Sequence, residues 1–397
     1  MQKIKILFRL RSLEMGGVPR VILDILDNLP KDRFDLTLML NLYQGELVKE
    51  IPKNIKLIVV EKGKEQMSSN RFLQNFQMLF RRFKLEVYTR FPSILYHLKV
   101  REKYDIEIAS SYAEFDMVLN SPDKKSRKIA WFHTDISYDV HQKNERNQKT
   151  ASERVEKLRK FDHVIFCAAN IRNAIEKYYH ITYPSSSVIY NAIRTDEVKE
   201  RSLATNVDLH NLKKPIFCSV GRLNKRKAYH TLINVHQKLI NEGFEHSIII
   251  LGDGEEKNNL TQQIKACDVQ ETFKLLGTKT NPFPYMKNSD YFVFPSKTEA
   301  YPLVINEALA LEIPIISTNV GGIPEMIDNG IDGMLVNDNE SEIYEAMKKV
   351  FTQPELFEKI RKNTAESYKK FDSQKIYKQI SDVFEQQYQL KLQNEES

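Results

Sequence analysis

Short apolar runs alternate with longer segments of helical period along almost the whole chain. Strands that alternate with helices predict an α/β protein with parallel sheets, because each helix carries the chain back to the edge where the next strand begins. In the first half the strand-like runs are 4–8, 36–40, 55–60, 106–109, 128–132, 164–167 and 188–190. In the second half they are 215–220, 247–251, 273–276, 291–294, 313–317 and 333–336. Three helical segments follow, at 341–351, 354–369 and 373–392.

The best domain break lies between residues 191 and 214, where no period holds and the composition turns polar. We therefore predict two doubly wound domains, 1–195 and 196–372, followed by a last helix at 373–397. Ligands of such sheets bind outside the carboxyl ends of the strands. Two such domains that face each other would enclose a cleft and close by hinge motion.

Composition narrows the class of protein. A chain of 397 residues with 41% hydrophobic and 28% charged residues is typical of a soluble globular protein with two domains. Cys167, Cys218 and Cys267 are widely spaced, which indicates a reducing compartment and no disulfide frame or zinc site. The N-terminus resembles a strand more than a signal peptide, and no run approaches the roughly 20 apolar residues of a membrane span. We expect a cytoplasmic protein whose membrane contact, if any, is peripheral.

The positive charge is concentrated in one segment. Between Arg71 and Lys103 eight basic residues face two acidic ones, an excess equal to the net charge of +6 of the whole chain. Aromatic residues recur there at spacings that share one helix face: Phe72, Phe76, Phe80 and Phe83. In one interpretation the aromatic face packs on the core and the basic residues face water. In the other, the segment lies on an anionic membrane surface, at the inner face of the cytoplasmic membrane, near a lipid-anchored acceptor. Nucleic acid is not expected, since no recognised binding module accompanies the segment.

Two carboxylates eight positions apart, Glu299 and Glu307, carry the strongest chemical signal. Pro302 stands where the first residue of a helix is expected, so the N–H groups of Leu303 and Val304 would be free to face an anion. Carboxylates repel phosphate, but they suit a ligand with vicinal hydroxyls beside its phosphates, such as a nucleotide sugar. One carboxylate would accept from sugar hydroxyls and the other from ribose hydroxyls. Solvated helix carboxylates are the alternative.

Two cations follow the strand at 216–219. Gly221 lets the backbone turn at the strand end, and Arg222 and Lys227 then enter the space where a pyrophosphate would lie. Positive charge there offsets the charge that develops on a departing diphosphate. The alternative is a solvated basic run at a helix start, although a helix N-terminus is a poor place for cations.

The first half offers further candidates at strand ends. Gly16 and Gly17 open a helix directly after the first strand, where glycine permits close approach of an anionic ligand or merely serves the turn. No acidic residue follows at dinucleotide spacing, so NAD is not expected. His133 follows the fifth strand, either as a structural histidine or as a site residue that Asp135 orients; Asp135 could instead bind an acceptor hydroxyl.

Six motifs follow one another along the chain: a Gly-Gly turn, a mid-domain His, G-R-L…K, G-D-G, E-x7-E and V-G-G-x-P-E. Together they resemble the retaining glycosyltransferases of family 4, which have the GT-B fold of two Rossmann-like domains around a cleft. The resemblance implies that the last helix crosses back to the first domain. It also implies roles for individual residues: Arg222 and Lys227 at the donor diphosphate, Gly16 and Gly17 at the donor phosphate or sugar, Thr278 near the nucleobase, Glu299 and Glu307 at donor hydroxyls, and His133 between donor sugar and acceptor.

The same resemblance implies transfer with retained configuration from a nucleotide sugar, most often a UDP-sugar, to a lipid-linked, lipopolysaccharide or capsule glycan. No D-x-D triplet occurs, so we expect neither a metal nor any cofactor besides the donor. Ala228 replaces the usual Gly after the Lys, and Tyr301-Pro302 replaces the commoner Phe-Gly of the family. Two other functions stay open: a nucleotide-sugar epimerase of the same fold, and a non-catalytic glycan-assembly protein.

Overall fold

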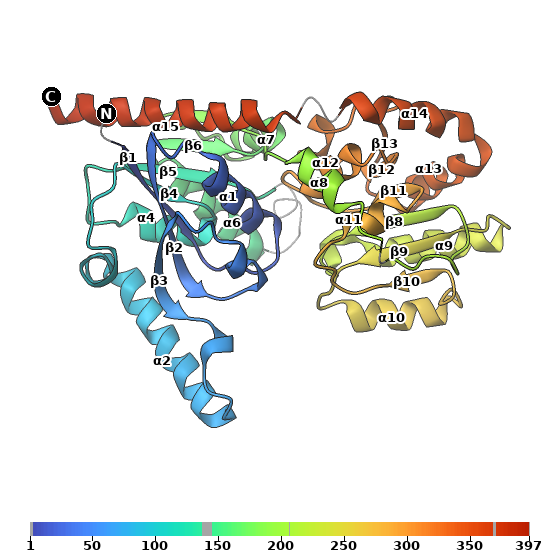
Figure 1. The fold of residues 1–397 in the computed structure, drawn as a ribbon, viewed down its shortest axis with the longest axis horizontal. Helices are drawn as coiled ribbons and strands as arrows, with labels where there is room; N and C mark the ends of the chain where they lie inside the picture. The colour runs from blue at the N-terminus through green and yellow to red at the C-terminus, as the bar shows by residue number, and fades with distance from the viewer. Residues whose placement is uncertain (1–2, 137–144, 206, 368–370, 397) are drawn as a thin grey trace. The chain divides into compact units, whose positions relative to one another are not determined.

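The structure is a computed structural model that describes residues 3–136, 145–205, 207–367 and 371–396 (Figure 1). It divides into two compact units. The N-terminal unit comprises Met1–Ala192 and Gln374–Ser397, and the C-terminal unit comprises Ile193–Ser373. The last helix therefore belongs with the first half of the chain, although almost two hundred residues separate the two in sequence.

The N-terminal unit is built on a seven-stranded parallel sheet with the order β3-β2-β1-β4-β5-β6-β7. Its strands are β1 (Ile4–Leu10), β2 (Phe34–Tyr43), β3 (Lys56–Lys62), β4 (Ile106–Ala109), β5 (Arg127–Phe132), β6 (His163–Phe166) and β7 (Ser186–Val188). Its helices are α1 (Gly17–Asn28), α2 (Arg71–Arg90), α3 (Pro92–Leu95), α4 (Phe115–Leu119), α6 (Glu145–Leu158), α7 (Ala169–Tyr179) and α15 (Ser373–Glu396).

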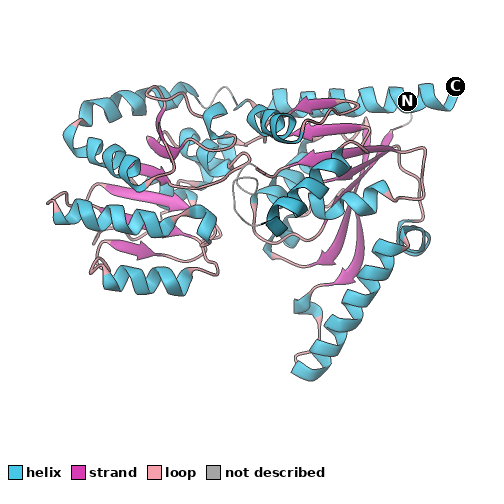
Figure 2. Cartoon of the chain, turned by 180° about the vertical axis from the view of Figure 1, so that it is seen from behind, coloured by secondary structure: helices cyan, strands magenta, loops and turns pink. Residues whose placement is uncertain are grey.

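The C-terminal unit repeats the design with a six-stranded parallel sheet in the order β10-β9-β8-β11-β12-β13. Its strands are β8 (Ile216–Val220), β9 (Ser247–Leu251), β10 (Phe273–Leu275), β11 (Tyr291–Phe294), β12 (Ile315–Thr318) and β13 (Gly333–Val336). Its helices are α8 (Thr195–Arg201), α9 (Tyr229–Asn241), α10 (Lys257–Ala266), α11 (Phe283–Lys287), α12 (Leu303–Ala310), α13 (Glu340–Thr352) and α14 (Pro354–Ser367). Figure 2 shows helices and strands alternating throughout both units.

The predicted α/β class and the pair of Rossmann-like domains are confirmed, and each predicted strand overlaps an observed one. β7 is displaced as a whole, since it begins and ends two residues before the predicted run 188–190. This edge strand is only half-buried, so hydrophobicity does not mark its start. The end of the helix predicted at 354–369 falls on Lys369, which lies outside the described residues.

Helix α15 packs on the sheet of the N-terminal unit through Phe384, which is fully buried. Its ring lies 6.0 Å from the ring of Phe8 and 6.1 Å from that of Phe34, both edge to face. Lys391 of the same helix pairs with Asp105 at 2.6 Å. The predicted crossing of the last helix to the first domain is therefore confirmed, and it depends on an aromatic contact together with a peripheral ion pair.

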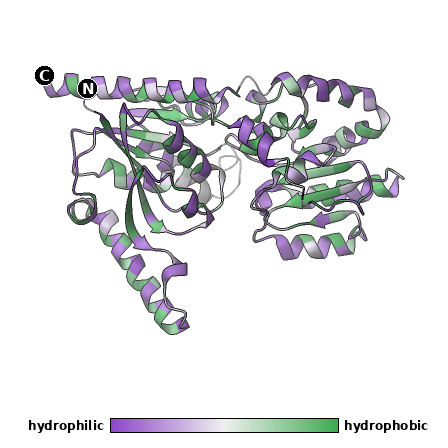
Figure 3. Cartoon of the chain, viewed as in Figure 1, coloured by the Kyte–Doolittle hydropathy of each residue, from purple (hydrophilic) through white to green (hydrophobic). Residues whose placement is uncertain are grey.

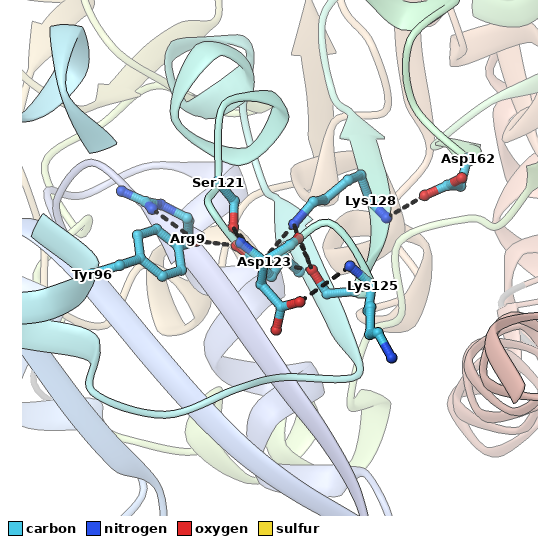
Figure 4. A network of polar contacts seen from close by, with 9 residues as sticks. Arg9, Tyr96, Ser121, Asp123, Lys125, Lys128 and Asp162 are labelled. Carbon is cyan, nitrogen blue, oxygen red and sulfur yellow. Dashed lines mark hydrogen bonds and ion pairs between the residues drawn. The ribbon is translucent and has the colours of Figure 1, made fainter. Parts of the chain in front are cut away.

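A buried polar network joins β1, β4 and β5 (Figure 4). Glu107 of β4 accepts hydrogen bonds from Ser121 and Ser126, each at 2.7 Å, and pairs with Lys128 at 2.5 Å. Burial lowers the pKa of Lys128, while the Glu107 carboxylate opposes that shift. Tyr96 donates to Glu107 and links it to Arg9. Because removing one member would leave a buried charge uncompensated, we assign this network a structural role.

Among the described residues, no helix combines the length and apolarity needed to cross a bilayer.

Candidate active site

In the C-terminal unit the strand order reverses between β8 and β11, because β9 and β10 lie on one side of this pair and β12 and β13 on the other. Such a switch point is where open α/β sheets bind ligands, outside the carboxyl ends of the strands. The loop after β8 carries Arg222 and Lys227, and the loop after β11 carries Glu299. The pairing of β8 with β11 therefore makes neighbours of two motifs about seventy residues apart.

Lys227 and Glu299 form the centre of this site. Lys227 Nζ lies 2.5 Å from Glu299 Oε1, with 18% of the lysine side chain and 13% of the glutamate side chain exposed. The same ammonium lies 4.5 Å from the centroid of the Phe294 ring, within the range of a cation–π contact. The side chain of Asn224 accepts from Lys227 N at 3.1 Å and caps the short turn that ends in this lysine. The arrangement presents a cation and a carboxylate side by side.

Ser296 supports the pair and was not identified from the sequence. It is fully buried, and its hydroxyl donates to Glu299 Oε1 at 2.6 Å. The next residue, Lys297, donates its N–H to the carbonyl of Arg226 at 2.7 Å, which ties the loop after β11 to the loop after β8. The sequence shows a hydroxyl residue three positions before Glu299, but only the fold shows that its side chain turns toward the carboxylate.

Arg222 is placed differently from Lys227. Its side chain is 72% exposed, and its Nε lies 3.3 Å from Glu255 Oε2, a carboxylate that is itself 58% exposed. The structure therefore provides one cation held within the site and one at its surface. An exposed guanidinium is available to an incoming anion, since its present partner holds it weakly.

The turn after β8 requires glycine for space, which corrects the predicted reason for Gly221. Its φ lies outside the left-handed region, but an added Cβ would lie 2.9 Å from the Tyr229 hydroxyl and 3.3 Å from Lys227 Cε. Gly252 has φ +151°, and its Cβ would lie 2.0 Å from the carbonyl oxygen of Gly221. The G-D-G loop after β9 thus packs backbone to backbone against the loop that carries Arg222 and Lys227.

Ala228 adopts the left-handed conformation, with φ 52° and ψ 31°, at the position where the resembled family has Gly. A non-glycine residue there costs about 1 kcal/mol. Because Ala228 keeps the conformation that glycine adopts freely, the replacement leaves the backbone path of the preceding Lys227 intact.

Helix α12 carries the second carboxylate. It begins at Leu303, and Pro302 is its N-cap, with an extended ψ of 116°. The prediction that Pro302 is the first helical residue was wrong by one position. The N–H groups of Leu303 and Val304 open the helix and have no acceptor within it. Glu307 lies one turn further on and is 6% exposed.

Thr278 is exposed at the end of β10, two strands from β8. The carbonyl of the preceding Gly277 accepts from Gly252 N at 3.0 Å. Thr278 therefore lies beside the G-D-G loop, at the margin of the edge that carries Lys227 and Glu299. In the part of the chain that the structure describes, no group of three His, Cys, Asp or Glu side chains could hold a metal ion.

The two glycines predicted for the donor site, Gly16 and Gly17, follow β1, and the local fold does not require them. Gly16 caps α1 in an extended conformation, and its added Cβ would meet atoms no closer than 3.7 Å. An added Cβ at Gly17 would meet nothing within 4 Å. Neither residue has a left-handed φ. The interpretation in which they only serve the turn therefore has no support from the backbone or from packing.

His133 follows β5 and stacks on Trp131, with ring centroids 5.8 Å apart and an interplanar angle of 12°. The residue as a whole is half-buried, and its Nε2 is buried and has no hydrogen-bond partner among the described residues. Asp135, itself 5% exposed, therefore does not bond this nitrogen. Burial lowers the pKa of His133 to about 3, so the imidazole is neutral near pH 7.

Two Rossmann-like units, with a cation–carboxylate pair at the switch point of the second, are the architecture of the GT-B fold class. Residues 15–197 match the model of Glycosyltransferase Family 4, and residues 201–367 match that of Glycosyl transferases group 1. The chain therefore carries a family 4 glycosyltransferase domain followed by a group 1 glycosyltransferase domain, as the motifs predicted.

Curated relatives are about a quarter to a third identical to the chain over the stretches that they match. One relative is a 4-alpha-N-acetylgalactosaminyltransferase of Campylobacter jejuni, whose name gives a diphospho-undecaprenol-linked sugar as its acceptor. It is 28% identical to the chain over 209 residues, which are 52% of this chain and 55% of that protein. The capsular polysaccharide biosynthesis glycosyltransferase CapM of Staphylococcus aureus is 29% identical over 168 residues, 42% of this chain and 44% of that protein. The chain spans about half the length of the curated relatives it matches.

Solved structures share the fold over almost the whole chain. HepE of Anabaena, crystallised with UDP-glucose, has a TM-score of 0.73 at 20% identity and covers 96% of this chain and 100% of its own. The sucrose-phosphate synthase of Thermosynechococcus elongatus has a TM-score of 0.77 at 14% identity, with 98% and 100% covered. At these identities the likeness establishes the fold.

Proposed function

We propose that the protein is a retaining, metal-independent glycosyltransferase. It would move a hexose-type sugar from a nucleotide sugar, a UDP-sugar by preference, to a lipid-linked, lipopolysaccharide or capsule glycan. The observation that carries the proposal is the contact between Lys227 and Glu299 at the switch point of the second sheet. HepE was crystallised with UDP-glucose, and the names of the C. jejuni and S. aureus relatives supply the acceptor class.

The donor diphosphate would lie against Lys227, Arg222 and the N–H groups at the start of α12. Positive groups fixed in place stabilise the departing diphosphate without reorganisation, which is the largest electrostatic requirement of the reaction. These groups supply the charge that a divalent cation would otherwise provide, and this is our reason for proposing metal independence. Glu299 would accept hydrogen bonds from the sugar and Glu307 from the ribose.

The N-terminal unit would contribute Gly16, Gly17, His133 and Asp135. With a pKa near 3, His133 is neutral at physiological pH, so it would hydrogen-bond a sugar hydroxyl and would not act as a general acid. In the proposed step the bond from the anomeric carbon to the diphosphate breaks, and the acceptor oxygen bonds to the same face of that carbon. The acceptor proton passes to the departing diphosphate, so no carboxylate nucleophile is needed.

A lipid-linked acceptor would bring the enzyme to the inner face of the cytoplasmic membrane, and we propose a cytoplasmic protein that acts there as a peripheral enzyme. No protein partner is needed for this proposal, and nucleic acid has no role in it.

Release of nucleoside diphosphate from UDP-, GDP- and ADP-sugars tests the proposal, with EDTA present and Glu299→Ala as the inactive control. We expect slow hydrolysis of one donor that survives EDTA and is lost in the variant. With an acceptor glycan, the anomeric configuration of the product read by NMR would test retention. Free epimerised sugar without transfer would favour the epimerase, and failure of UDP to stabilise the protein against heat would favour the non-catalytic alternative.

A further inference from the structure

Helix α2 of the N-terminal unit turns its apolar side to solvent. Five of its large apolar side chains are more than half exposed: Phe72 (85%), Phe76 (62%), Leu79 (66%), Phe80 (53%) and Phe83 (62%). A single residue of the whole helix, Tyr88, is buried. Isolated exposed apolar residues are ordinary, but a contiguous group of this kind marks an interaction surface. The structure thus decides against the interpretation in which these aromatics face the core.

The exposed face lies opposite the face by which α2 packs on its own unit. At 3.6 residues per turn, the five apolar side chains fall within about 100° of the helix circumference. From Arg71 to Glu86 the less exposed residues are Gln74, Gln77, Met78, Arg81, Lys84 and Leu85. These lie on the other side. Over these turns the helix therefore turns its aromatic side outward and a mostly polar side inward, while Leu85 and Tyr88 near its end pack against the core.

Specific contacts hold the helix in this orientation. Arg81 Nη1 donates to the carbonyl of Lys62 at 3.1 Å, and Lys84 Nζ pairs with Glu61 at 3.1 Å, both partners being in the edge strand β3. At its start, the side chain of Asn70 caps α2 by accepting from the N–H groups of Phe72 and Leu73. Beyond β3 the first turns of α2 extend away from the sheet (Figures 1 and 2).

Positive charge borders the apolar stripe. The helix has five basic residues and one acidic residue, Glu86. By the helical repeat, Arg71 and Arg82 flank one edge of the stripe and Lys84 the other. Figure 3 shows the resulting interleaving of hydrophobic and hydrophilic residues along α2. Aromatic residues on one face with bordering Lys and Arg are the pattern of a helix that lies in the interface of an anionic bilayer.

We propose that α2 is a docking surface for an anionic phospholipid membrane, with Phe72, Phe76 and Phe80 inserted among the acyl chains and Arg71 and Arg82 at the headgroups. The four exposed phenylalanines present about 500 Å² of apolar surface, at the upper end of what soluble monomers expose. A net charge of +4 on the helix selects an anionic lipid surface over an uncharged partner surface. This inference concerns membrane binding alone and stands independently of the donor site.

Flotation of the full-length protein with vesicles tests the surface without donor or acceptor. Vesicles of phosphatidylcholine alone are compared with vesicles containing phosphatidylglycerol. The variants are Phe72→Ser/Phe76→Ser/Phe80→Ser and Arg71→Glu/Arg82→Glu. The matched controls are Leu203→Ser, another residue with a large exposed fraction, and Lys265→Glu/Lys362→Glu, which reverses two exposed charges in the C-terminal unit. Thermal unfolding confirms that each variant is folded.

We expect the wild type to float with anionic vesicles, and each α2 variant to lose about tenfold or more in partition coefficient while the controls bind like the wild type. In Phe76→Trp, brominated acyl chains should quench the new indole, since Trp131 is 1% exposed. Wild type that stays with the soluble fraction, or α2 variants that float normally, would overturn the proposal. A concentration-dependent dimer that only the aromatic variant loses would assign the face to a second copy instead.

Discussion

Replacing Lys227 by methionine tests the central contact of the site, because methionine keeps an apolar stem and removes the ammonium. The change leaves the Glu299 carboxylate, 13% exposed, with the Ser296 hydroxyl as its remaining side-chain partner among the described residues. Losing one member of a fully buried pair costs about 3–5 kcal/mol, and losing one of a surface pair costs about 0–1 kcal/mol. The partial exposure of this pair places the expected loss of unfolding free energy at about 1–3 kcal/mol.

For a unit of this size, such a loss lowers the unfolding midpoint by about 3–10 °C. The same substitution should lower kcat/KM for the donor by about 30- to 1000-fold, since it removes one charged contact to the departing diphosphate. Arg222→Met is the matched control. Its side chain is 72% exposed, so it should cost activity with less than about 0.5 kcal/mol of stability.

Differential scanning calorimetry and nucleoside diphosphate release would measure the two effects on the same preparations. A Lys227→Met protein as stable as the wild type would show that the pair does not form in solution. Full activity in both variants would refute the diphosphate clamp itself. Loss of stability with full activity would make the contact structural.

Three further predictions follow from individual contacts. Gly17→Ala should raise stability by about 0.4–1 kcal/mol, since its Cβ meets open space, yet raise KM for the donor; unchanged kinetics would remove Gly17 from the donor site. Ser296→Ala should lower kcat/KM by about 10- to 100-fold through Glu299, and unaltered rates would show that Lys227 alone positions that carboxylate. Burial lowers the pKa of His163 and His246 to about 4, so the unfolded chain binds more protons below pH 6.5. Stability should be full above pH 6.5 and fall toward pH 4, measured as the unfolding midpoint by circular dichroism, and an unchanged midpoint at pH 5 would contradict it.

Much of the fold follows from local pattern. Strands such as 247–251 are continuous apolar runs because both faces of a parallel sheet are covered, and this property is visible in the sequence. Hydrophobicity does not locate the start of edge strand β7, since its residues are only half-buried and its first two are serines. The start of α12 was misplaced by one residue, because proline is compatible with both the N-cap and the first helical position.

The sequence by itself determined which side chains are available for the chemistry, because Arg222, Lys227, Glu299 and Glu307 stand in short motifs at strand and helix ends. It did not determine that Lys227 touches Glu299, since strand order, not chain order, places β8 beside β11. Nor did it determine the orientation of α2, because a helical period fixes which residues share a face but not which way that face points. Packing of Tyr88 and Leu85 in the core, together with the contacts of Arg81 and Lys84 with β3, decided that orientation. They placed the aromatic side in solvent.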